Sequence, residues 1–261
     1  MVNHLTHSEL DFAGYGGWAD FMRRVSDLTM LRYGSLQSLI LLCEDVVNRE
    51  VPGDLVEAGV WRGGASFVMA EALRRAADPS RKVWMFDSFE GLPAPAEVDG
   101  SRAQDYVHDV GSPWYLNNCR ADFAEVQQSA EQFGLADRVT VVKGWFDRTL
   151  PEHRDRIGGI ALLRIDCDWF ESTRCCLDEL FDQVSPGGVV IIDDYYYYDG
   201  AALAVHDFLG RRGYAYRVES VLSDGLGVAY NECAFIRKTA ALDHDRSDRL
   251  PVPSRFTVRG A

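Results

Sequence analysis

The sequence predicts an α/β fold of the Rossmann-like, doubly wound kind, with a mostly parallel seven-stranded sheet, an antiparallel last strand and an N-terminal helical cap. Strand-like runs alternate with helical segments from Gly53 onward, which is typical of βαβ units. The central runs have glycine or carboxylates at their carboxyl ends. A chain of 261 residues, 47% of them hydrophobic, is long enough to build one continuous core.

Short apolar runs in the sequence predict the strands. The first, at 54–59, leads through a glycine-rich turn into a helix predicted at about 65–77. Four further runs predict the strands 82–87, 138–144, 160–166 and 188–194. After a helix around 201–211, two last strands at 216–222 and 232–238 are expected to form a hairpin at the sheet edge.

The chain divides into three predicted parts. Residues 1–50 contain an amphipathic stretch at 36–47 and are expected to form a helical cap or lid. Residues 51–239 form the α/β domain, and the charged, proline-containing residues 240–261 are expected to be a flexible tail. Inside the domain, the polar segment 92–118 is predicted to be a long loop, and loops of that length are usually functional or disordered.

Composition excludes several classes of partner. Forty acidic against 27 basic residues give a net charge of −13, which repels nucleic acid and anionic lipid, so we expect no nucleic-acid and no membrane partner. The first ten residues lack the features of a signal peptide, and no apolar run approaches membrane-spanning length, so a cytoplasmic location is expected. The six cysteines form no CxxC pair and are predicted to be free thiols.

The turn after the first strand is the first candidate for a ligand site, because doubly wound sheets bind ligands at the carboxyl ends of their strands. Its glycines (Gly59, Gly63 and Gly64) match neither a dinucleotide motif nor a phosphate-binding loop, which favours a nucleotide without pyrophosphate. Asp87, at the end of the second strand, is placed to accept the two hydroxyls of a ribose. Trp145 could contact an adenine ring, although aromatic residues at strand ends are more often core residues.

Four aspartates follow two predicted neighbouring strands: Asp166, Asp168, Asp193 and Asp194. Like charges this close raise one another's pKa unless a cation neutralises them, and a hard divalent cation such as Mg²⁺ prefers oxygen ligands. Such a cation lowers the pKa of a bound hydroxyl, and a nearby carboxylate can accept its proton. The alternative is that Asp166 or Asp168 caps a helix that begins near Phe170.

Five blocks in this order resemble the macrocin-type (TylF/MycF) O-methyltransferases: residues 53–64 (GDLVEAGVWRGG), 83–93, 143–151, 163–173 and 185–195. The resemblance implies methyl transfer from S-adenosylmethionine to a sugar hydroxyl of a glycosylated natural product, with Mg²⁺ as the metal. It also implies roles for individual residues. Asp166, Asp193 and Asp194 would bind the metal, and Asp168 would be the general base. The cofactor site would include Met30, Glu57, Gly59, Trp61, Asp87 and Ser88, with Met30 closing over it.

The chain departs from the family pattern on the acceptor side. Cys167 stands where the family usually has glycine, and Trp169-Phe170 replaces Leu-Tyr. Four tyrosines at 195–198 replace a shorter stretch, and residues 92–118, with His108 and Trp114, match no family pattern. We therefore expect the acceptor to be selected by these segments. His206 matches a family pattern, but its helical position favours a structural role.

Other functions remain open at this stage. A Mg²⁺-dependent methyltransferase acting on a catechol or phenol would need the same aspartates, and a non-catalytic S-adenosylmethionine-binding module would retain the fold. An NAD-dependent oxidoreductase is disfavoured because the dinucleotide glycine motif is missing. A homo-oligomer is expected from the family and from the apolar residues Leu36, Leu39, Ile40 and Leu41.

Overall fold

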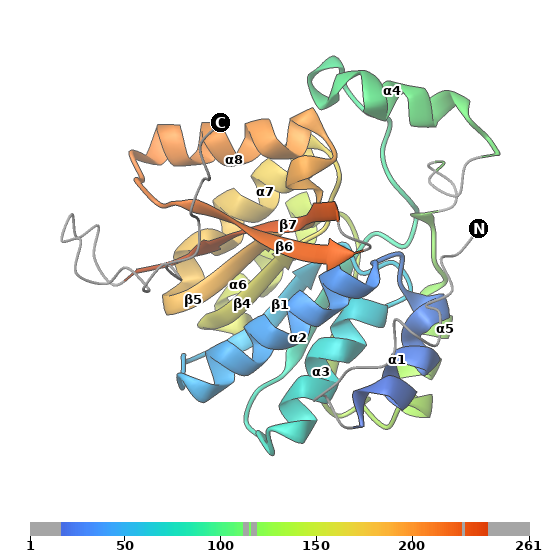
Figure 1. Ribbon diagram of the computed structural model, residues 1–261, viewed down its shortest axis with the longest axis vertical. Coiled ribbons are helices and arrows are strands. Elements are labelled where there is room, and N and C mark those ends of the chain that lie inside the picture. Colours follow the sequence, from blue (N-terminus) through green and yellow to red (C-terminus); the bar gives the residue numbers. More distant parts are fainter. Residues whose placement is uncertain (1–16, 112–114, 116–118, 226–227, 240–261) are drawn as a thin grey trace, which may run out of the picture.

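A single seven-stranded sheet forms the centre of the computed structural model, which describes residues 17–111, 115, 119–225 and 228–239 (Figure 1). The strand order is β3-β2-β1-β4-β5-β7-β6. The strands are β1 (Asp54–Ala58), β2 (Val83–Asp87), β3 (Val139–Lys143), β4 (Ile160–Ile165), β5 (Val184–Ile192), β6 (Val218–Gly225) and β7 (Val228–Arg237). Strands β1 to β5 are parallel, and β7 is antiparallel to both β5 and β6. The predicted fold class is confirmed.

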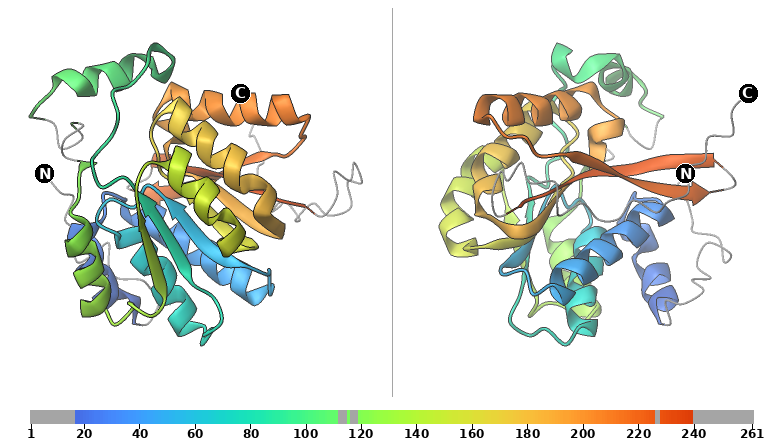
Figure 2. Two further views of the ribbon diagram at one scale, coloured as in Figure 1. Left: turned by 180° about the vertical axis from the view of Figure 1, so that it is seen from behind. Right: turned by 60° about the vertical axis from the view of Figure 1, so that its left-hand side comes forward.

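Helices cover both faces of this sheet, as Figures 1 and 2 show. One layer contains α1 (Trp18–Val25), α2 (Tyr33–Asn48), α3 (Gly64–Arg75) and α5 (Phe123–Gln132), and the other contains α6 (Phe146–Ile157), α7 (Phe170–Leu180) and α8 (Asp199–Arg212). The short 3-10 helices are η1 (Ser26–Leu28), η2 (Glu97–Asp99), η4 (Phe181–Gln183) and η5 (Asp193–Tyr196). None of the helices in the described ranges has the length and apolar character needed to cross a membrane.

Alternating side chains of the central strands enter two separate cores, because successive residues of a strand point to opposite faces. Leu55 and Ile191 pack beneath the α1–α3 layer, whereas Val56 and Val190 pack beneath the α6–α8 layer. Both faces are apolar, which explains why these strands read as continuous hydrophobic runs. The N-terminal helices contribute Trp18, among others, to the first core, so the predicted cap shares its core with the sheet.

The segment 92–118 differs from the predicted loop because it contains η2 and a nine-residue helix, α4 (Gly100–His108). Helix α4 lies apart from the two helical layers (Figure 2). Ala103 is its one buried residue, and its apolar spacing is limited to Ala103, Tyr106 and Val107, which is too short a pattern to reveal a helix. Trp114 and the end of this segment lie outside the described residues, as does the predicted tail at 240–261.

The chain direction reverses between β1 and β4, which creates the crevice where ligands bind in sheets of this kind. From β1 the chain moves outward to β2 and β3, and then returns to β4 on the other side of β1. Gly59 begins the turn after β1 with a φ of +87°, and a Cβ atom there would lie 1.7 Å from the carbonyl oxygen of Asp166. The close approach of these two strand ends therefore requires glycine at this position.

We predict that Gly59→Ala lowers the free energy of unfolding by about 3 kcal/mol or more, because the new methyl group overlaps a backbone oxygen and the φ angle is strained. Gly134→Ala is the matched control, since Gly134 also has a positive φ, +67°, but nothing lies within 4 Å of a Cβ there. Urea unfolding of both variants measures the difference. Equal losses of stability would show that the contact with Asp166 is unimportant.

Candidate active site

A single pocket of about 380 Å³ opens at the carboxyl ends of β1, β2, β4 and β5. Every site residue proposed from the sequence lines it: Met30, Glu57, Gly59, Trp61, Asp87, Ser88, Trp145, Asp166, Asp168, Asp193 and Asp194. Residues from six separate stretches of the chain are thus brought to one cavity, whose size lies in the range of small-molecule sites. Their roles stay predictions, and the geometry below limits what each one can do.

Asp87 connects the first two strand ends. Its carboxylate accepts hydrogen bonds from the backbone N–H groups of Val60 and Trp61, both at 2.9 Å, and of Phe89 at 2.7 Å. Burial raises the pKa of Asp87, although these three donors lower it. A carboxylate has about four acceptor positions, so capacity remains for a ribose hydroxyl. Asp87 therefore has a structural function beside its predicted ligand-binding one.

Trp61 and Trp145 are the aromatic residues at this end of the pocket. Trp61 has a positive φ of 47°, and the guanidinium of Arg62 lies 4.6 Å from the centre of its ring. Trp145 precedes α6 and leaves 40% of its surface exposed while lining the pocket. A large exposed aromatic surface at a pocket rim is available for stacking against a planar ring, whereas a core residue would be buried.

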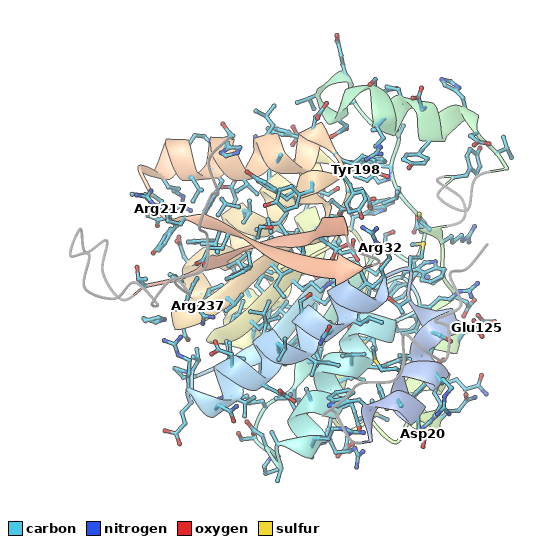
Figure 3. The ribbon with its side chains drawn as sticks, viewed as in Figure 1. Asp20, Arg32, Glu125, Tyr198, Arg217 and Arg237 are labelled. Carbon is cyan, nitrogen blue, oxygen red and sulfur yellow. The ribbon has the colours of Figure 1, made fainter. Side chains whose placement is uncertain are left out.

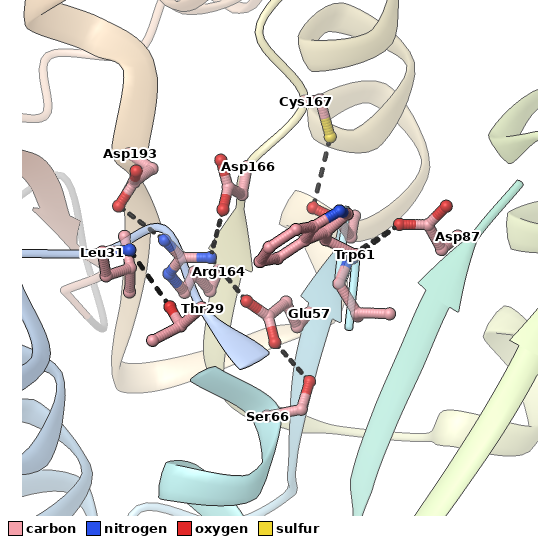
Figure 4. A network of polar contacts seen from close by, with 12 residues as sticks. Thr29, Leu31, Glu57, Trp61, Ser66, Asp87, Arg164, Asp166, Cys167 and Asp193 are labelled. Atoms are coloured by element: carbon pink, nitrogen blue, oxygen red, sulfur yellow. Dashed lines mark hydrogen bonds and ion pairs between the residues drawn. The ribbon is translucent and has the colours of Figure 1, made fainter. Parts of the chain in front are cut away.

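Arg164 is the central residue of the site and was not predicted from the sequence. It is 2% exposed, and its guanidinium contacts three carboxylates: Glu57 at 2.5 Å, Asp166 at 2.7 Å and Asp193 at 2.6 Å (Figure 4). Glu57 also accepts a short hydrogen bond from the hydroxyl of Ser66 on α3. An arginine within the apolar run IALLRI was the available signal, because an unpaired guanidinium is almost never buried.

The strand register explains which aspartates reach Arg164. Glu57 is the neighbour of Arg164 across β1 and β4, and Ile191 is its neighbour on β5. Side chains two residues apart share a face of the sheet, so Asp166 and Asp193 follow Arg164 and Ile191 on the same face. Asp194, one residue further, is directed elsewhere and accepts a 2.9 Å hydrogen bond from the backbone N–H of Asp168.

Burial and mutual repulsion raise the pKa values of the acidic groups. Burial raises the pKa of Glu57 although Arg164 lowers it, and it raises the pKa of Asp193 to about 7 despite the same guanidinium. The pKa values of Asp168 and Asp194 lie well above their usual range because both are buried beside other aspartates. Carboxyl groups of this kind bind protons near neutral pH, or a cation in their place.

The carboxylates of Asp166, Asp168 and Asp194 form one compact group, in which one oxygen from each lies within 4.8 Å of the others. Asp193 is not in this group; its carboxylate contacts Arg164, as the carboxylate of Asp166 also does. The metal ligands implied by the family resemblance were Asp166, Asp193 and Asp194, so the two sets share two members. Asp166 and Asp193 each contact Arg164 through one oxygen, which leaves the other oxygen of each for a cation. The donor chemistry fits a hard divalent ion such as Mg²⁺.

The helix that follows Asp168 is capped by neither of the two aspartates considered from the sequence, Asp166 and Asp168. Helix α7 begins at Phe170, whose backbone N–H donates to the carboxylate of Asp99 at 2.7 Å. Asp99 belongs to η2, far from α7 in the sequence. Asp168 instead has a left-handed backbone with a φ of 59°, just before the helix. A left-handed non-glycine residue at a pocket is typical of a functional position.

Segments that depart from the family pattern also line the pocket. Arg102 and Tyr106 of α4, Cys119, and the tyrosines Tyr197 and Tyr198 line it. Figure 3 labels Tyr198 and Arg32, two lining residues from opposite ends of the chain. Arg32 donates a short hydrogen bond to the hydroxyl of Tyr197, which joins the start of α2 to η5.

Tyr195 and Tyr196 do not line the pocket, and neither do the histidines within the described residues, His108, His153 and His206. The hydroxyl of Tyr195 and Nε2 of His206 are 2.9 Å apart, which attaches η5 to α8. This contact agrees with the structural role expected for His206. His108 is exposed at the end of α4. The run therefore divides into a structural tyrosine, an exposed one, Tyr196, and two that line the pocket.

Solved structures of methyltransferases share this fold. The structure of the O-methyltransferase NovP is 33% identical, with a TM-score of 0.69, and the match covers 81% of this chain and 82% of NovP. The sheet order, the pocket at the strand ends and this likeness together define an O-methyltransferase.

Residues 22–232 match the family model of macrocin O-methyltransferase (TylF), and the chain belongs to this family. It is 40% identical over 210 residues to the 8-demethyl-8-(2,3-dimethoxy-alpha-L-rhamnosyl)-tetracenomycin-C 4'-O-methyltransferase of Streptomyces olivaceus, which covers 79% of this chain and 76% of that protein. It is 33% identical over 201 residues to the mycinamicin III 3''-O-methyltransferase of Micromonospora griseorubida, which covers 76% of each. The resemblance noted from the sequence blocks is confirmed.

We predict that Arg164→Met destabilises the protein by about 3–5 kcal/mol, because it leaves three carboxylates without their shared cation. The loss should grow as the pH rises above about 7. Below that pH Asp193 binds a proton in the wild-type protein. Removing Arg164 there still breaks hydrogen bonds, but it leaves one fewer negative carboxylate buried without a cation. Chemical denaturation at pH 5.5 and pH 8.5 measures the difference, with Arg49→Met, at the exposed end of α2, as the control. A loss independent of pH would contradict this account.

Proposed function

We propose that this protein transfers a methyl group from S-adenosylmethionine to a hydroxyl of a sugar on a glycosylated natural product, with the help of a divalent cation. The observation that carries this proposal is the division of one pocket into two ends. Asp87 and Trp61 lie to one side of Asp166 and Asp193 (Figure 4), and Asp166 belongs to the carboxylate group that includes Asp168. The relatives from S. olivaceus and M. griseorubida, whose names describe methylation of a rhamnosyl group and of mycinamicin III, support a sugar acceptor.

The cofactor end supplies groups suited to each part of S-adenosylmethionine. The free acceptor capacity of Asp87 suits the ribose hydroxyls, and the exposed face of Trp145 suits the adenine ring. Glycine at position 59 lets the backbone approach the ligand closely. Met30 lines the pocket from the loop before α2, which supports its predicted place over the cofactor.

Asp168 is suited to be the general base. Its carboxylate lies among other acidic groups that raise its pKa, and a cation bound beside it would keep the carboxylate ionised and able to accept a proton. In the proposed step, the hydroxyl oxygen of the acceptor forms a bond to the methyl carbon while the carbon–sulfur bond of the sulfonium breaks. The hydroxyl proton moves to Asp168, and S-adenosylhomocysteine leaves as the neutral product.

The proposed cation ligands are Asp166, Asp193 and Asp194. A Mg²⁺ ion bound there would neutralise the clustered carboxylates and lower the pKa of a bound sugar hydroxyl. Arg164 holds Asp166 and Asp193 in place by contacting one oxygen of each. The two side chains are therefore oriented before a cation arrives, which reduces the entropy lost on binding.

The test of the function is a methyl-transfer assay with three kinds of acceptor. Purified protein is incubated with labelled S-adenosylmethionine and Mg²⁺, and with rhamnosylated aglycones, with free catechols or with no acceptor. Transfer to the glycosides that stops on adding EDTA is the expected result. Transfer to catechols alone would establish the phenolic alternative, and cofactor binding by calorimetry without turnover would establish a non-catalytic module.

We predict that Asp168→Asn lowers kcat by about 10²–10⁴-fold while Mg²⁺ still binds, because the amide cannot accept the proton. Asp193→Asn and Asp194→Asn should weaken Mg²⁺ binding instead. Calorimetric titration of each variant with Mg²⁺ measures this difference. If Asp168→Asn abolishes Mg²⁺ binding and Asp193→Asn does not, the compact group of Asp166, Asp168 and Asp194 is the metal site, and Asp168 is a ligand.

Three broader expectations accompany this proposal. Residues 51–239 form the methyltransferase domain, with residues 1–50 as its cap. The protein acts in the cytoplasm, in agreement with its strongly negative charge and a small-molecule acceptor. It forms a homo-oligomer, and light scattering of the purified protein measures that state.

A further inference from the structure

Asp99 is a buried aspartate with no role in the proposed chemistry. It is 2% exposed, and its carboxylate accepts two backbone hydrogen bonds of 2.7 Å. One comes from Ala96, three residues earlier, and the other from Phe170 at the start of α7. The same carboxylate therefore closes its own turn and caps a helix 71 residues away.

The start of α8 closes over this carboxylate. A Cβ atom at Gly200 would lie 2.1 Å from Oδ1 of Asp99, and one at Gly100 would lie 2.4 Å from the side chain of Asp199. The pairs Asp99-Gly100 and Asp199-Gly200 thus pack against each other without room for further atoms. This packing places η2 and the start of α4 against α8 and α7.

A second contact joins the same two segments. The indole N–H of Trp169 donates to the carbonyl of Pro93 at 2.9 Å, and the Trp169 ring packs against Tyr198 with centroids 4.9 Å apart. Tyr198 in turn contacts Tyr106 of α4 at 6.0 Å. The segment that lines the acceptor side of the pocket is therefore fixed to Trp169 and Phe170, the two residues that follow Asp168.

Asp168 depends on this attachment because its own backbone is held from both sides. Its N–H donates to Asp194, and the helix that begins two residues later is capped by Asp99. The left-handed φ of 59° at Asp168 persists only if the neighbouring backbone is fixed. A shift at the start of α7 would move the carboxylate of Asp168.

We propose that Asp99 is a positioning residue that couples the acceptor-binding segment to Asp168, so that binding of the acceptor and placement of the base occur together. This inference rests on the proposed function for the role of Asp168. It assigns the η2–α4 segment to the catalytic geometry as well as to acceptor selection.

The test compares Asp99→Ala with Asp122→Ala. Asp122 also caps a helix, accepting the N–H groups of Ala124 and Glu125 at the start of α5, but it does not line the pocket. Both variants should lower Tm by a few degrees, since each loses a cap. Only Asp99→Ala should lower kcat, by roughly 10–100-fold, because misplacement of about 1 Å reduces rates by that order.

Two further readouts separate positioning from general damage. The Kd for S-adenosylmethionine, measured by calorimetry, should be unchanged in Asp99→Ala, because the cofactor end is built by other strand ends. Hydrogen exchange should accelerate in peptides covering residues 168–173 and 96–108 in this variant, and only near the start of α5 in Asp122→Ala. If Asp99→Ala does not fold, Asp99→Asn keeps one acceptor oxygen and should show a smaller loss of kcat.

The proposal is overturned if the Asp99 variants have a lower Tm but the wild-type kcat, since Asp99 would then only cap helix α7. It is also overturned if kcat and cofactor affinity fall together. If the wild-type protein methylates no glycoside or catechol, the proposed function has failed. In that case the rate of hydrogen exchange in residues 168–173 decides by itself whether Asp99 fixes the backbone of Asp168.

Discussion

The buried guanidinium of Arg164 is the interaction on which the site depends. Glu57, Asp166 and Asp193 come from three neighbouring strands, and their charges would repel one another in a region with little water. A single cation that contacts all three lets the carboxyl ends of β1, β4 and β5 lie together. Because these strands flank the point where the chain direction reverses, the same interaction shapes the crevice itself.

The sequence was sufficient for the sheet because the apolar runs of the central strands are continuous and end in glycine or carboxylates. Strand ends in a parallel sheet meet at one edge, so the order of runs alone predicts that Asp87, Asp166 and Asp194 are close in space. The residues that could be placed from the sequence were those at the carboxyl end of a predicted strand. Asp193 shows where such prediction ends. Its contact with Arg164 depends on the register between β4 and β5, which the sequence alone does not reveal.

The features that escaped prediction are those fixed by contacts between distant segments. Asp99 looked like one more polar residue of a long loop, and its function as the cap of α7 depends on a hydrogen bond across 71 residues. Helix α4 has a single buried residue, and its apolar spacing covers only one helical turn. The part of the pocket at the strand ends thus comes from regular strands that sequence patterns describe well, whereas the part lined by α4 and the tyrosine run comes from segments that only tertiary structure defines.

The left-handed backbone of Asp168 also limits how this position can change during evolution. Asparagine and glycine are the residues that adopt such a backbone with little strain, so most other replacements would disturb the start of α7 as well as remove the carboxylate. A lineage that no longer needs methyl transfer could thus lose the proposed base by one change to asparagine and keep an intact, ligand-binding protein. The backbone at this position makes catalysis easier to lose than the fold.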